Sequence, residues 1–370
     1  MKRRQLLQYL PLSALFLSVT SLNSRAETEF ERYQRQQQQG VQQLRQQWQR
    51  YRKNYLAAYR DYRRQLSRVW SKPQLSDKTR WVEYSNDLKT RRVVDFGNNQ
   101  VQLSFAASDA AALTDARIRA EFEKVIAATI DQAYHGDPVL NQATGQQPPG
   151  SQQAVSQIDP NGINQLLQQA SQQRQKTTKG EVVTVTIPLT SDALPQRARG
   201  YLPVVKQAAH KWQVPVALVL AIMQTESAFN PMARSHIPAF GLMQIVPGSA
   251  GRDASKHAYG KERLLSGKEL FNPAINIELG CAYLNLLNSR YLKAIKDPQS
   301  RLYCTIAAYN TGAGNVARAF SGTTSVNSAA KKINRMSSKQ VYAHLRQHLK
   351  YQEARNYIYK VTQAMPAYQA

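Results

Sequence analysis

The stretch from Val214 to Glu226 constrains the fold of this chain more than any other part of the sequence. Pro215 suits a first helical turn, and the residues after it are apolar on every side. A helix that is apolar all round must be buried. Glu226, four residues after Ile222 and seven after Val219, therefore falls on an apolar face near the helix end.

A carboxyl group at that position has an unusual environment. Desolvation and the negative end of the helix dipole both raise its pKa, as a general acid that works near neutral pH requires. The alternative role of Glu226 is structural, as a buried glutamate paired to an arginine.

A helical pattern with Gly, Pro and Asn breaks continues from Pro195 to the end of the chain. About 170 residues is an ordinary size for one domain, so we expect an all-α domain over residues 193–370. The predicted helical segments are 195–212, 215–227, 242–250, 273–292, 300–309, 314–320, 328–335, 338–348 and 352–363.

Residues 73–192 have a mixed pattern that predicts an α+β N-terminal domain. Arg91–Phe96 and Gln100–Phe105 alternate apolar and polar residues about Gly97-Asn98-Asn99, which is typical of a hairpin. None of the ionisable residues of this region forms a recognisable catalytic group. The other predicted elements are a helix from Ser108 to about Tyr134, a loop at 141–160, a short helix near Asn161–Gln172 and a strand at Val182–Ile187.

Residues 27–72 form a Gln/Arg-rich segment with an amphipathic helical pattern. Ten of the sixteen residues from Gln34 to Gln49 are glutamine. Three interpretations stay open: a coiled coil that self-associates, a basic helix on a membrane or wall surface, or a helix whose stripe packs on its own domain. The larger apolar residues, with Ala58 between Tyr55 and Tyr62, follow steps of three and four, as in a helical seam: Val41, Leu44, Trp48, Tyr51, Tyr55, Tyr62, Leu66 and Val69.

Residues 1–26 have the three parts of a secretory signal peptide. Lys2, Arg3 and Arg4 precede an apolar run from Leu6 to Val19, and small residues stand at both positions that guide cleavage after Ala26. The Arg3-Arg4 pair also fits a twin-arginine signal, so the export route stays open. We therefore expect an exported protein.

The charge of the chain predicts an anionic partner. There are 49 Lys and Arg residues against 24 Asp and Glu residues, which gives a net charge of +25. Nucleic acid, a membrane surface or an acidic envelope polymer would each fit, but export excludes nucleic acid as the expected partner.

Two cysteines exclude a disulfide-stapled scaffold, and the sequence predicts no metal and no cofactor. Cys281 and Cys304 either pair or remain buried thiols.

Four motifs follow one another in the helical half of the chain: Glu226-Ser227, Gly241-Leu242-Met243-Gln244, Ala308-Tyr309-Asn310, and Glu-x-Arg-Asn-Tyr at 353–357. In this order and spacing they resemble the lytic transglycosylase family, with its lysozyme-like catalytic domain of the goose-type and soluble lytic transglycosylase fold. The region 73–192, through Trp81-Val82-Glu83-Tyr84 and the hairpin after it, is similar to the N-terminal domain of the murein transglycosylase C type. The resemblance covers about residues 65–365.

The resemblance implies a peptidoglycan lytic transglycosylase, a carbon–oxygen lyase that acts on glycan strands. Such an enzyme cleaves the β-1,4 bond between N-acetylmuramic acid and N-acetylglucosamine and leaves 1,6-anhydro-muramic ends. Glu226 would be its single general acid and base. The other matched positions would contact the sugar or the catalytic carboxyl, and they are Ser235, Met243, Gln244, Tyr309 and Tyr357.

The spacing of acidic residues agrees with a site that has one carboxylate. No acidic residue occurs between Glu226 and Asp253, whereas ordinary glycosidases place two carboxylates across the bond. A sugar hydroxyl can take the place of the second carboxylate. The alternatives are a goose-type-lysozyme-like hydrolase of the same bond, or an inactive peptidoglycan-binding or coiled-coil scaffold.

Two features depart from the family pattern. Pro238 stands where the family has a glycine three residues before Gly241, so we expect the loop beside Ser235 to run differently, because proline fixes φ near about −65°. The membrane-bound relatives carry a lipid-anchoring cysteine after the signal, whereas the first cysteine here is Cys281. We therefore expect a periplasmic protein without a lipoprotein anchor, peripheral to the outer membrane only if the basic helix or an uncleaved signal holds it there.

Overall fold

The computed structural model describes residues 29–106, 108–144, 152–155, 162–189 and 193–369. The signal peptide predicted at residues 1–26 lies outside these ranges, as does most of the loop predicted at 141–160. By its contacts the chain divides into Met1–Gln42 and Gln43–Ala370, and every contact described below lies within the second unit.

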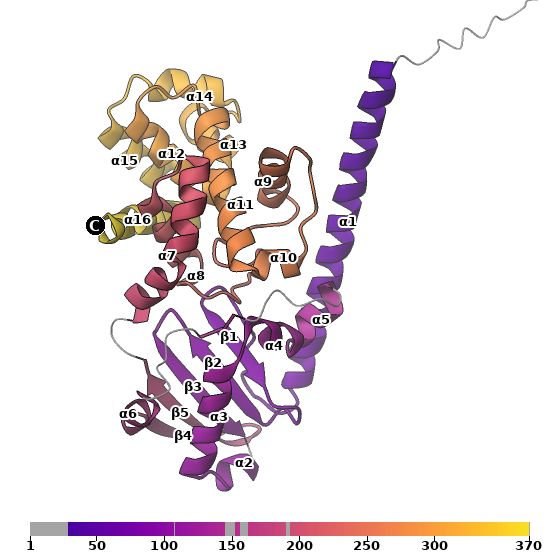
Figure 1. Cartoon of the computed structure of the whole chain (residues 1–370), viewed down its shortest axis with the longest axis vertical. Coiled ribbons are helices and arrows are strands. Elements are labelled where there is room, and N and C mark those ends of the chain that lie inside the picture. The colour runs from indigo at the N-terminus through magenta and orange to yellow at the C-terminus, as the bar shows by residue number, and fades with distance from the viewer. Residues whose placement is uncertain (1–28, 107, 145–151, 156–161, 190–192, 370) are drawn as a thin grey trace, which may run out of the picture. The chain divides into compact units, whose positions relative to one another are not determined.

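Five antiparallel strands form one sheet in the order β1-β2-β3-β5-β4 (Figure 1). The predicted hairpin is confirmed, since β2 pairs with β3 from Thr90 opposite Phe105 to Asp95 opposite Gln100. The edge strand β4 takes the place of the end of the helix predicted near Asn161–Gln172. Its side chains are exposed from Ser171 to Lys176, so no apolar alternation marks it. The strands are β1 Arg80–Tyr84, β2 Thr90–Asp95, β3 Gln100–Ala106, β4 Ser171–Thr177 and β5 Gly180–Pro188.

Three helices replace the single helix predicted from Ser108 to Tyr134. Thr114 and Thr129 are the N-caps of the second and third, and each accepts a hydrogen bond from a backbone N–H three residues further on. An N-cap residue has an extended backbone, so each threonine separates two helices that the apolar pattern alone would join. The helices beside the sheet are α2 Ser108–Ala111, α3 Asp115–Ala127, α4 Ile130–His135, α5 Pro138–Thr144 and α6 Ile163–Gln168. Helix α5 also overlaps the start of the predicted loop.

The rest of the described chain is mainly helical, as predicted for residues 193–370. The helices are α7 Ala193–Trp212, α8 Val216–Ser227, α9 Ala250–Tyr259, α10 Gly267–Phe271, α11 Pro273–Leu286, η2 Leu287–Tyr291, α12 Pro298–Thr311, α13 Ala313–Ser321, α14 Val326–Ile333, α15 Ser338–His348, α16 Gln352–Ala364 and η3 Met365–Tyr368. No helix of the described ranges has an apolar stretch long enough to cross a membrane.

The helix predicted at 242–250 is wrong. The segment forms turns closed by a backbone bridge between Phe240 and Ile245, and α9 begins only at Ala250. Gly241 and Gln244 have φ angles of +74° and +49°, a left-handed conformation that a right-handed helix cannot contain. The apolar pattern here reflects burial in the core and not helical periodicity.

Helix α1 spans Glu29–Leu66, and its apolar stripe from Trp48 onward packs on its own chain. Tyr55 and Leu66 are fully buried, and the rings of Tyr51 and Tyr55 meet the ring of Phe240 edge-on. The Trp48 ring lies against Gly248. The stripe from Trp48 onward therefore agrees with the interpretation that the helix packs on its own domain. This packing covers the surface that a coiled coil would use.

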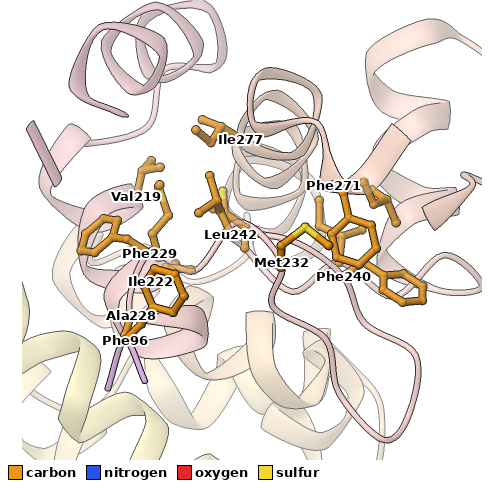
Figure 2. Close-up of a cluster of buried hydrophobic side chains, with 14 of the residues drawn as sticks. Phe96, Val219, Ile222, Ala228, Phe229, Met232, Phe240, Leu242, Phe271 and Ile277 are labelled. Carbon is orange, nitrogen blue, oxygen red and sulfur yellow. The ribbon is translucent and has the colours of Figure 1, made fainter. Parts of the chain in front are cut away.

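The buried core runs from the sheet into the helical region. Phe96, beside the hairpin turn, belongs to the same cluster as Val219 and Ile222 of α8 and Phe229 after it (Figure 2). Arg197 of α7 donates hydrogen bonds to the Phe96 carbonyl oxygen at 3.0 Å and to Asn99 Oδ1 at 3.3 Å. The hairpin is therefore held by both apolar packing and a buried guanidinium.

A buried ion pair links the loop after α8 to the helices beside the sheet. Arg234 Nη2 lies 2.8 Å from Asp137 Oδ2, and the two side chains are only 2% and 7% exposed. Asp137 also accepts the backbone N–H groups of Val139 and Leu140 at the start of α5. Burial opposes the charge on Arg234, but the Asp137 carboxylate outweighs this effect and raises the pKa of the guanidinium.

A protein in which one partner of this pair is replaced should unfold much more easily. We expect Arg234→Met to lower the free energy of unfolding by about 3–5 kcal/mol, because the Asp137 charge would remain buried alone. Arg64→Met, which breaks the exposed Arg64–Asp61 pair, should change it by less than about 1 kcal/mol. Urea denaturation of both variants measures the difference, and similar small losses would contradict the role of the buried pair.

Candidate active site

A cleft of about 500 Å³ lies at the C-terminal end of α8, where Glu226 is placed. Four of the six predicted site residues line it, namely Glu226, Ser235, Gln244 and Tyr309. The remaining walls come from the segment before β1, the start of α9, α11, the α12–α13 junction and the region where α16 begins. They are Lys78, Ile237, Ala239, Ile245, Val246, Ser249, Ala250, Tyr283, Asn310, Thr311, Gly312, Asn315, Tyr351 and Glu353.

Glu226 sits in the last turn of α8 with its side chain only 6% exposed. Burial raises the pKa of its carboxyl, and the nearby charge of Lys78 and the Tyr357 hydroxyl act in the opposite direction. The raised pKa predicted from the helix pattern therefore has desolvation as its main cause. A carboxyl of this kind can hold a proton at a pH where an exposed glutamate has lost it.

Lys78 is a member of the site that the sequence did not reveal. Its ammonium lies 3.3 Å from Glu226 Oε2 and 3.5 Å from Glu353 Oε1. Burial disfavours the Lys78 charge, but the two carboxylates outweigh it and raise the pKa of the ammonium. Lys78 stands 148 residues before Glu226 and in no motif, so only the fold could bring the two together.

Glu353 places a second carboxylate in the cleft. It lies at the start of α16, in the same Glu-x-Arg-Asn-Tyr motif as Tyr357, and its side chain is 74% exposed. The segment between Glu226 and Asp253 has no acidic residue, but the fold brings a distant one, Glu353, to the cleft. The two carboxylates differ sharply in environment, since one is buried and the other is solvated.

The turn that carries Gln244 is fixed by Asn276 of α11. Asn276 donates to the carbonyl oxygens of Phe240 and Leu270 at 2.9 and 2.8 Å, and its Oδ1 accepts the Met243 N–H at 2.8 Å. A Cβ at Gly241 would overlap the Leu270 carbonyl and the Asn276 amide, so glycine is required there. Asn276 is fully buried, and its one signal in sequence is a polar residue inside an apolar helix.

The Gln244 side chain lies in the cleft wall, and one of its two polar atoms has no hydrogen-bond partner among the described residues. Its Nε2 donates to the Gly241 carbonyl oxygen at 3.1 Å, while its Oε1 is buried and has no hydrogen-bond partner among the described residues. An unpaired buried oxygen is costly unless a ligand supplies a donor. The Gln244 amide is therefore prepared to accept a hydrogen bond.

Tyr309 of α12 and Tyr357 of α16 lie near the Glu226 carboxyl. Tyr309 donates to the Met243 carbonyl oxygen at 2.8 Å, which links the Ala-Tyr-Asn motif to the Gln244 turn. Tyr357 is 5% exposed, and its hydroxyl lies near enough to Glu226 to lower the pKa of that carboxyl, although the two groups fall short of full hydrogen-bond geometry. Burial raises the pKa of both phenols well above the usual value, so both remain neutral donors.

Ser235 lines the cleft, but its hydroxyl is engaged within its own loop. It donates to the Ile237 carbonyl oxygen and accepts the Ala239 N–H, so the segment around Pro238 forms a closed turn. Met243 requires a correction: its side chain is fully buried against Gly280 and is not part of the cleft. Only the backbone of Met243 serves the site, through the bonds to Asn276 and Tyr309.

The structure also answers the question of the cysteines. Cys281 and Cys304 are both buried free thiols, and burial raises the pKa of the Cys281 thiol to about 12. Among the described residues, no three His, Cys, Asp or Glu side chains come together in a group that could hold a metal ion.

Residues 203–332 match the family model described as Transglycosylase SLT domain. Among curated proteins, membrane-bound lytic murein transglycosylase C of Histophilus somni (strain 2336) is 44% identical over 208 residues, which are 56% of this chain and 56% of that protein. The protein of the same name from Salmonella arizonae is 48% identical over 187 residues, which are 50% of this chain and 51% of that protein. The chain thus spans about half the length of the curated relatives it matches.

Two solved structures are also similar. An inactive mutant of the lytic transglycosylase Slt from Pseudomonas aeruginosa is 27% identical over 45% of this chain and 23% of that chain, with a TM-score of 0.33. The 70 kDa soluble lytic transglycosylase of Escherichia coli is 24% identical over 46% of this chain and 24% of that chain, with a TM-score of 0.36. The resemblance first seen in the four motifs is therefore matched by the family model and by the curated relatives.

The raised pKa of Glu226 predicts a pH-dependent effect of Glu226→Gln on stability. The folded protein binds the proton of the Glu226 carboxyl more tightly than the unfolded chain does. The stability that protonated Glu226 contributes to the folded state is therefore complete below about pH 4.3, and it is lost as the pH rises through the pKa of Glu226 in the folded protein. We expect Glu226→Gln to unfold at a higher temperature than the wild type at pH 7, with the difference vanishing near pH 4. Thermal unfolding across this range tests it, with the exposed Glu123→Gln as control. A constant difference at every pH would contradict the raised pKa.

Proposed function

We propose that this protein is a peptidoglycan lytic transglycosylase that cleaves the β-1,4 bond between N-acetylmuramic acid and N-acetylglucosamine. The observation that carries the proposal is the buried Glu226 carboxyl, which lies in a cleft with Gln244 and Tyr309 at the positions that the family motifs assign. The match of residues 203–332 to the transglycosylase family model supports it.

In the proposed reaction Glu226 acts first as an acid and then as a base. The protonated carboxyl gives its proton to the glycosidic oxygen as the bond from that oxygen to C1 of the muramic residue breaks. The resulting carboxylate takes the proton of the muramic C6 hydroxyl, whose oxygen forms a new bond to C1. The products are a free 4-hydroxyl on the leaving sugar and a 1,6-anhydro-muramic end, and Glu226 is protonated again.

Lys78 fits the second half of this cycle. After Glu226 has lost its proton, the ammonium at 3.3 Å stabilises the carboxylate. Too strong a stabilisation would leave Glu226 without a proton for the first step, and burial of the carboxyl opposes this. The opposing effects of Lys78 and desolvation thus place the pKa of Glu226 where both steps can occur.

The walls of the cleft provide the contacts that hold a glycan strand. Gln244 offers an unpaired acceptor for an N–H or O–H of the sugar, and Ser235 and Tyr309 flank the same space. Tyr357 positions the carboxyl of Glu226. We propose these four residues, without Met243, as the binding and positioning set around Glu226.

We further propose the organisation and location of the chain. Residues 1–26 would be a signal peptide, residues 27–72 an amphipathic helix, residues 73–192 the N-terminal α+β domain, and residues 193–370 the catalytic domain. The name of the curated relatives supports a place in the cell envelope. We place the protein in the periplasm, where the net charge without the four basic residues of 1–26 (25 − 4 = +21) favours a glycan that bears carboxylates.

One observation favours a second candidate, a goose-type-lysozyme-like hydrolase of the same bond. Glu353 stands across Lys78 from Glu226, and a hydrolase needs a second carboxylate as base or nucleophile. In a hydrolase, Glu353 would activate water and the product would be a reducing muramic end.

The decisive experiment digests purified sacculi and identifies the muropeptides by mass spectrometry. The wild type should release 1,6-anhydro products, and Glu226→Gln should lower the rate by about 10²-fold or more, since it removes the only proposed proton donor. Reducing ends without anhydro products would contradict the transglycosylase. Unchanged activity of Glu226→Gln would show that the assigned site is wrong.

Glu353→Gln separates the two candidates on the same assay. If Glu353 only pairs with Lys78 at the mouth of the cleft, this variant should keep most of the anhydro-forming activity. A loss as large as that of Glu226→Gln would overturn the single-carboxylate mechanism, and together with reducing ends as the wild-type product it would favour the hydrolase.

Lys78→Gln should shift the pH profile of the reaction. The Lys78 charge lowers the pKa of Glu226, so its removal should raise that pKa and move the alkaline fall of activity to higher pH. The pH dependence of kcat/KM measures the shift, with Lys331→Gln, a substitution at an exposed residue of α14, as control. A profile that stays in place or moves to lower pH would contradict the role of Lys78.

A further inference from the structure

A second pocket lies on the sheet, where β2, β4, β5 and the segment between α1 and β1 supply its lining. It has a volume of about 640 Å³ and shares no lining residue with the catalytic cleft. Trp70 and Arg91 line it together with the end of β4, the turn after it and the first half of β5. We call it the Trp70 pocket.

Arg91 is the unusual member of the Trp70 pocket. It lies on β2, is only 7% exposed, and its guanidinium carbon stands 4.5 Å from the centre of the Trp70 ring. It donates to the Lys72 carbonyl oxygen at 3.3 Å and to Ser104 Oγ at 3.1 Å. Its Nε is buried and has no hydrogen-bond partner among the described residues.

The positive charge of Arg91 has no counter-charge in the described part of the chain. No Asp or Glu there lies within ion-pair distance of it, in contrast to Arg92 beside it, which pairs with Glu83 and Glu121. Burial lowers the pKa of Arg91, and the charge is therefore held at a cost that an anion would relieve.

The remaining walls have the chemistry of a carboxylate site. Lys72 and Lys176 add two more positive charges, and the lining contains no Asp or Glu. Arg91, Ser104 and Thr184 form a row of polar side chains, since Ser104 Oγ accepts a hydrogen bond from Arg91 and lies 3.0 Å from the Thr184 hydroxyl. The Trp70 ring and Val182 supply apolar surface beside these polar groups.

We propose that the Trp70 pocket is a second binding site, which takes the free carboxylate end of a short peptide. The Arg91 guanidinium would hold the carboxylate, and the hydroxyls and Gln175 would meet the peptide amides. If the proposed function is right, the natural source is a stem peptide of peptidoglycan. The α+β domain would then hold the polymer by its peptides while the helical domain holds the glycan.

The test is calorimetric titration of the full chain with N-acetyl-D-alanyl-D-alanine and with the same peptide as its C-terminal amide. We expect saturable one-to-one binding of the acid and none of the amide, with weaker binding as salt increases. Binding of the amide equal to that of the acid would overturn the proposal. Inorganic phosphate is the third probe, and binding of phosphate without binding of the peptide acid would overturn the assignment to a peptide.

Variants assign the binding to this pocket. Arg91→Gln should weaken binding of the peptide acid by about tenfold or more, and the exposed pair Lys72→Gln with Lys176→Gln should weaken it without any effect on folding. Arg197→Gln is the matched control, because Arg197 is also a buried arginine but does not line the pocket. Equal losses in Arg91→Gln and Arg197→Gln, with none in the lysine double variant, would assign Arg91 a structural role alone.

Sacculus digestion keeps this proposal separate from the proposed function. A protein that forms anhydro products but does not bind the peptide acid would overturn only the Trp70 pocket. A protein that binds the peptide acid through Arg91 but cleaves no glycan would confirm the pocket and overturn only the catalytic activity.

Discussion

The buried pair between Arg234 and Asp137 is the contact on which the geometry of the cleft depends. The loop after α8 carries Arg234, and the same loop bonds the segment before β1: the Arg234 N–H reaches the Asp77 carbonyl oxygen at 3.2 Å, and Asn230 Nδ2 reaches that of Lys78 at 3.3 Å. Because these bonds fix the backbone around Lys78, its ammonium can meet Glu226. The α+β region therefore supplies part of the cleft around Glu226 and is not only a neighbour of it.

Glu226 obtains its chemistry from where α8 ends. The helix is apolar on all sides, so packing buries it and carries the carboxyl out of water with it. Three polar groups then adjust the result: Lys78 and Tyr357 favour the charged form, and the more distant Glu353 disfavours it. Asn276 and Tyr309 hold the turn that places Gln244 in the same cleft, through their bonds to the Met243 backbone. Desolvation raises the pKa of Glu226, and Lys78 and Tyr357 limit how far it rises.

The sequence could predict the parts of this structure that depend on local periodicity. The hairpin about Gly97, the burial of α8 and the position of Glu226 follow from apolar spacing and turn residues. It could not predict the break of one expected helix at Thr114 and Thr129, since a threonine inside an apolar pattern is ambiguous between cap and interior. The apolar residues after Gly241 fit a helix equally well, because a buried turn and a buried helix need the same apolar residues. Lys78 and Asn276 act through contacts between distant segments, which no local pattern encodes.

The ion pair between Lys78 and Glu226 joins two segments of the chain that are far apart in sequence, and this has a thermodynamic consequence. Each proton that Glu226 binds removes a partner of Lys78 and so weakens the hold of one segment on the other. By reciprocity, any event that draws the Lys78 segment away must increase the affinity of Glu226 for protons by the same free energy. A ligand or a mechanical load that moved the Lys78 segment away would therefore raise the pKa of Glu226 and change its protonation without any change in the pH of the medium.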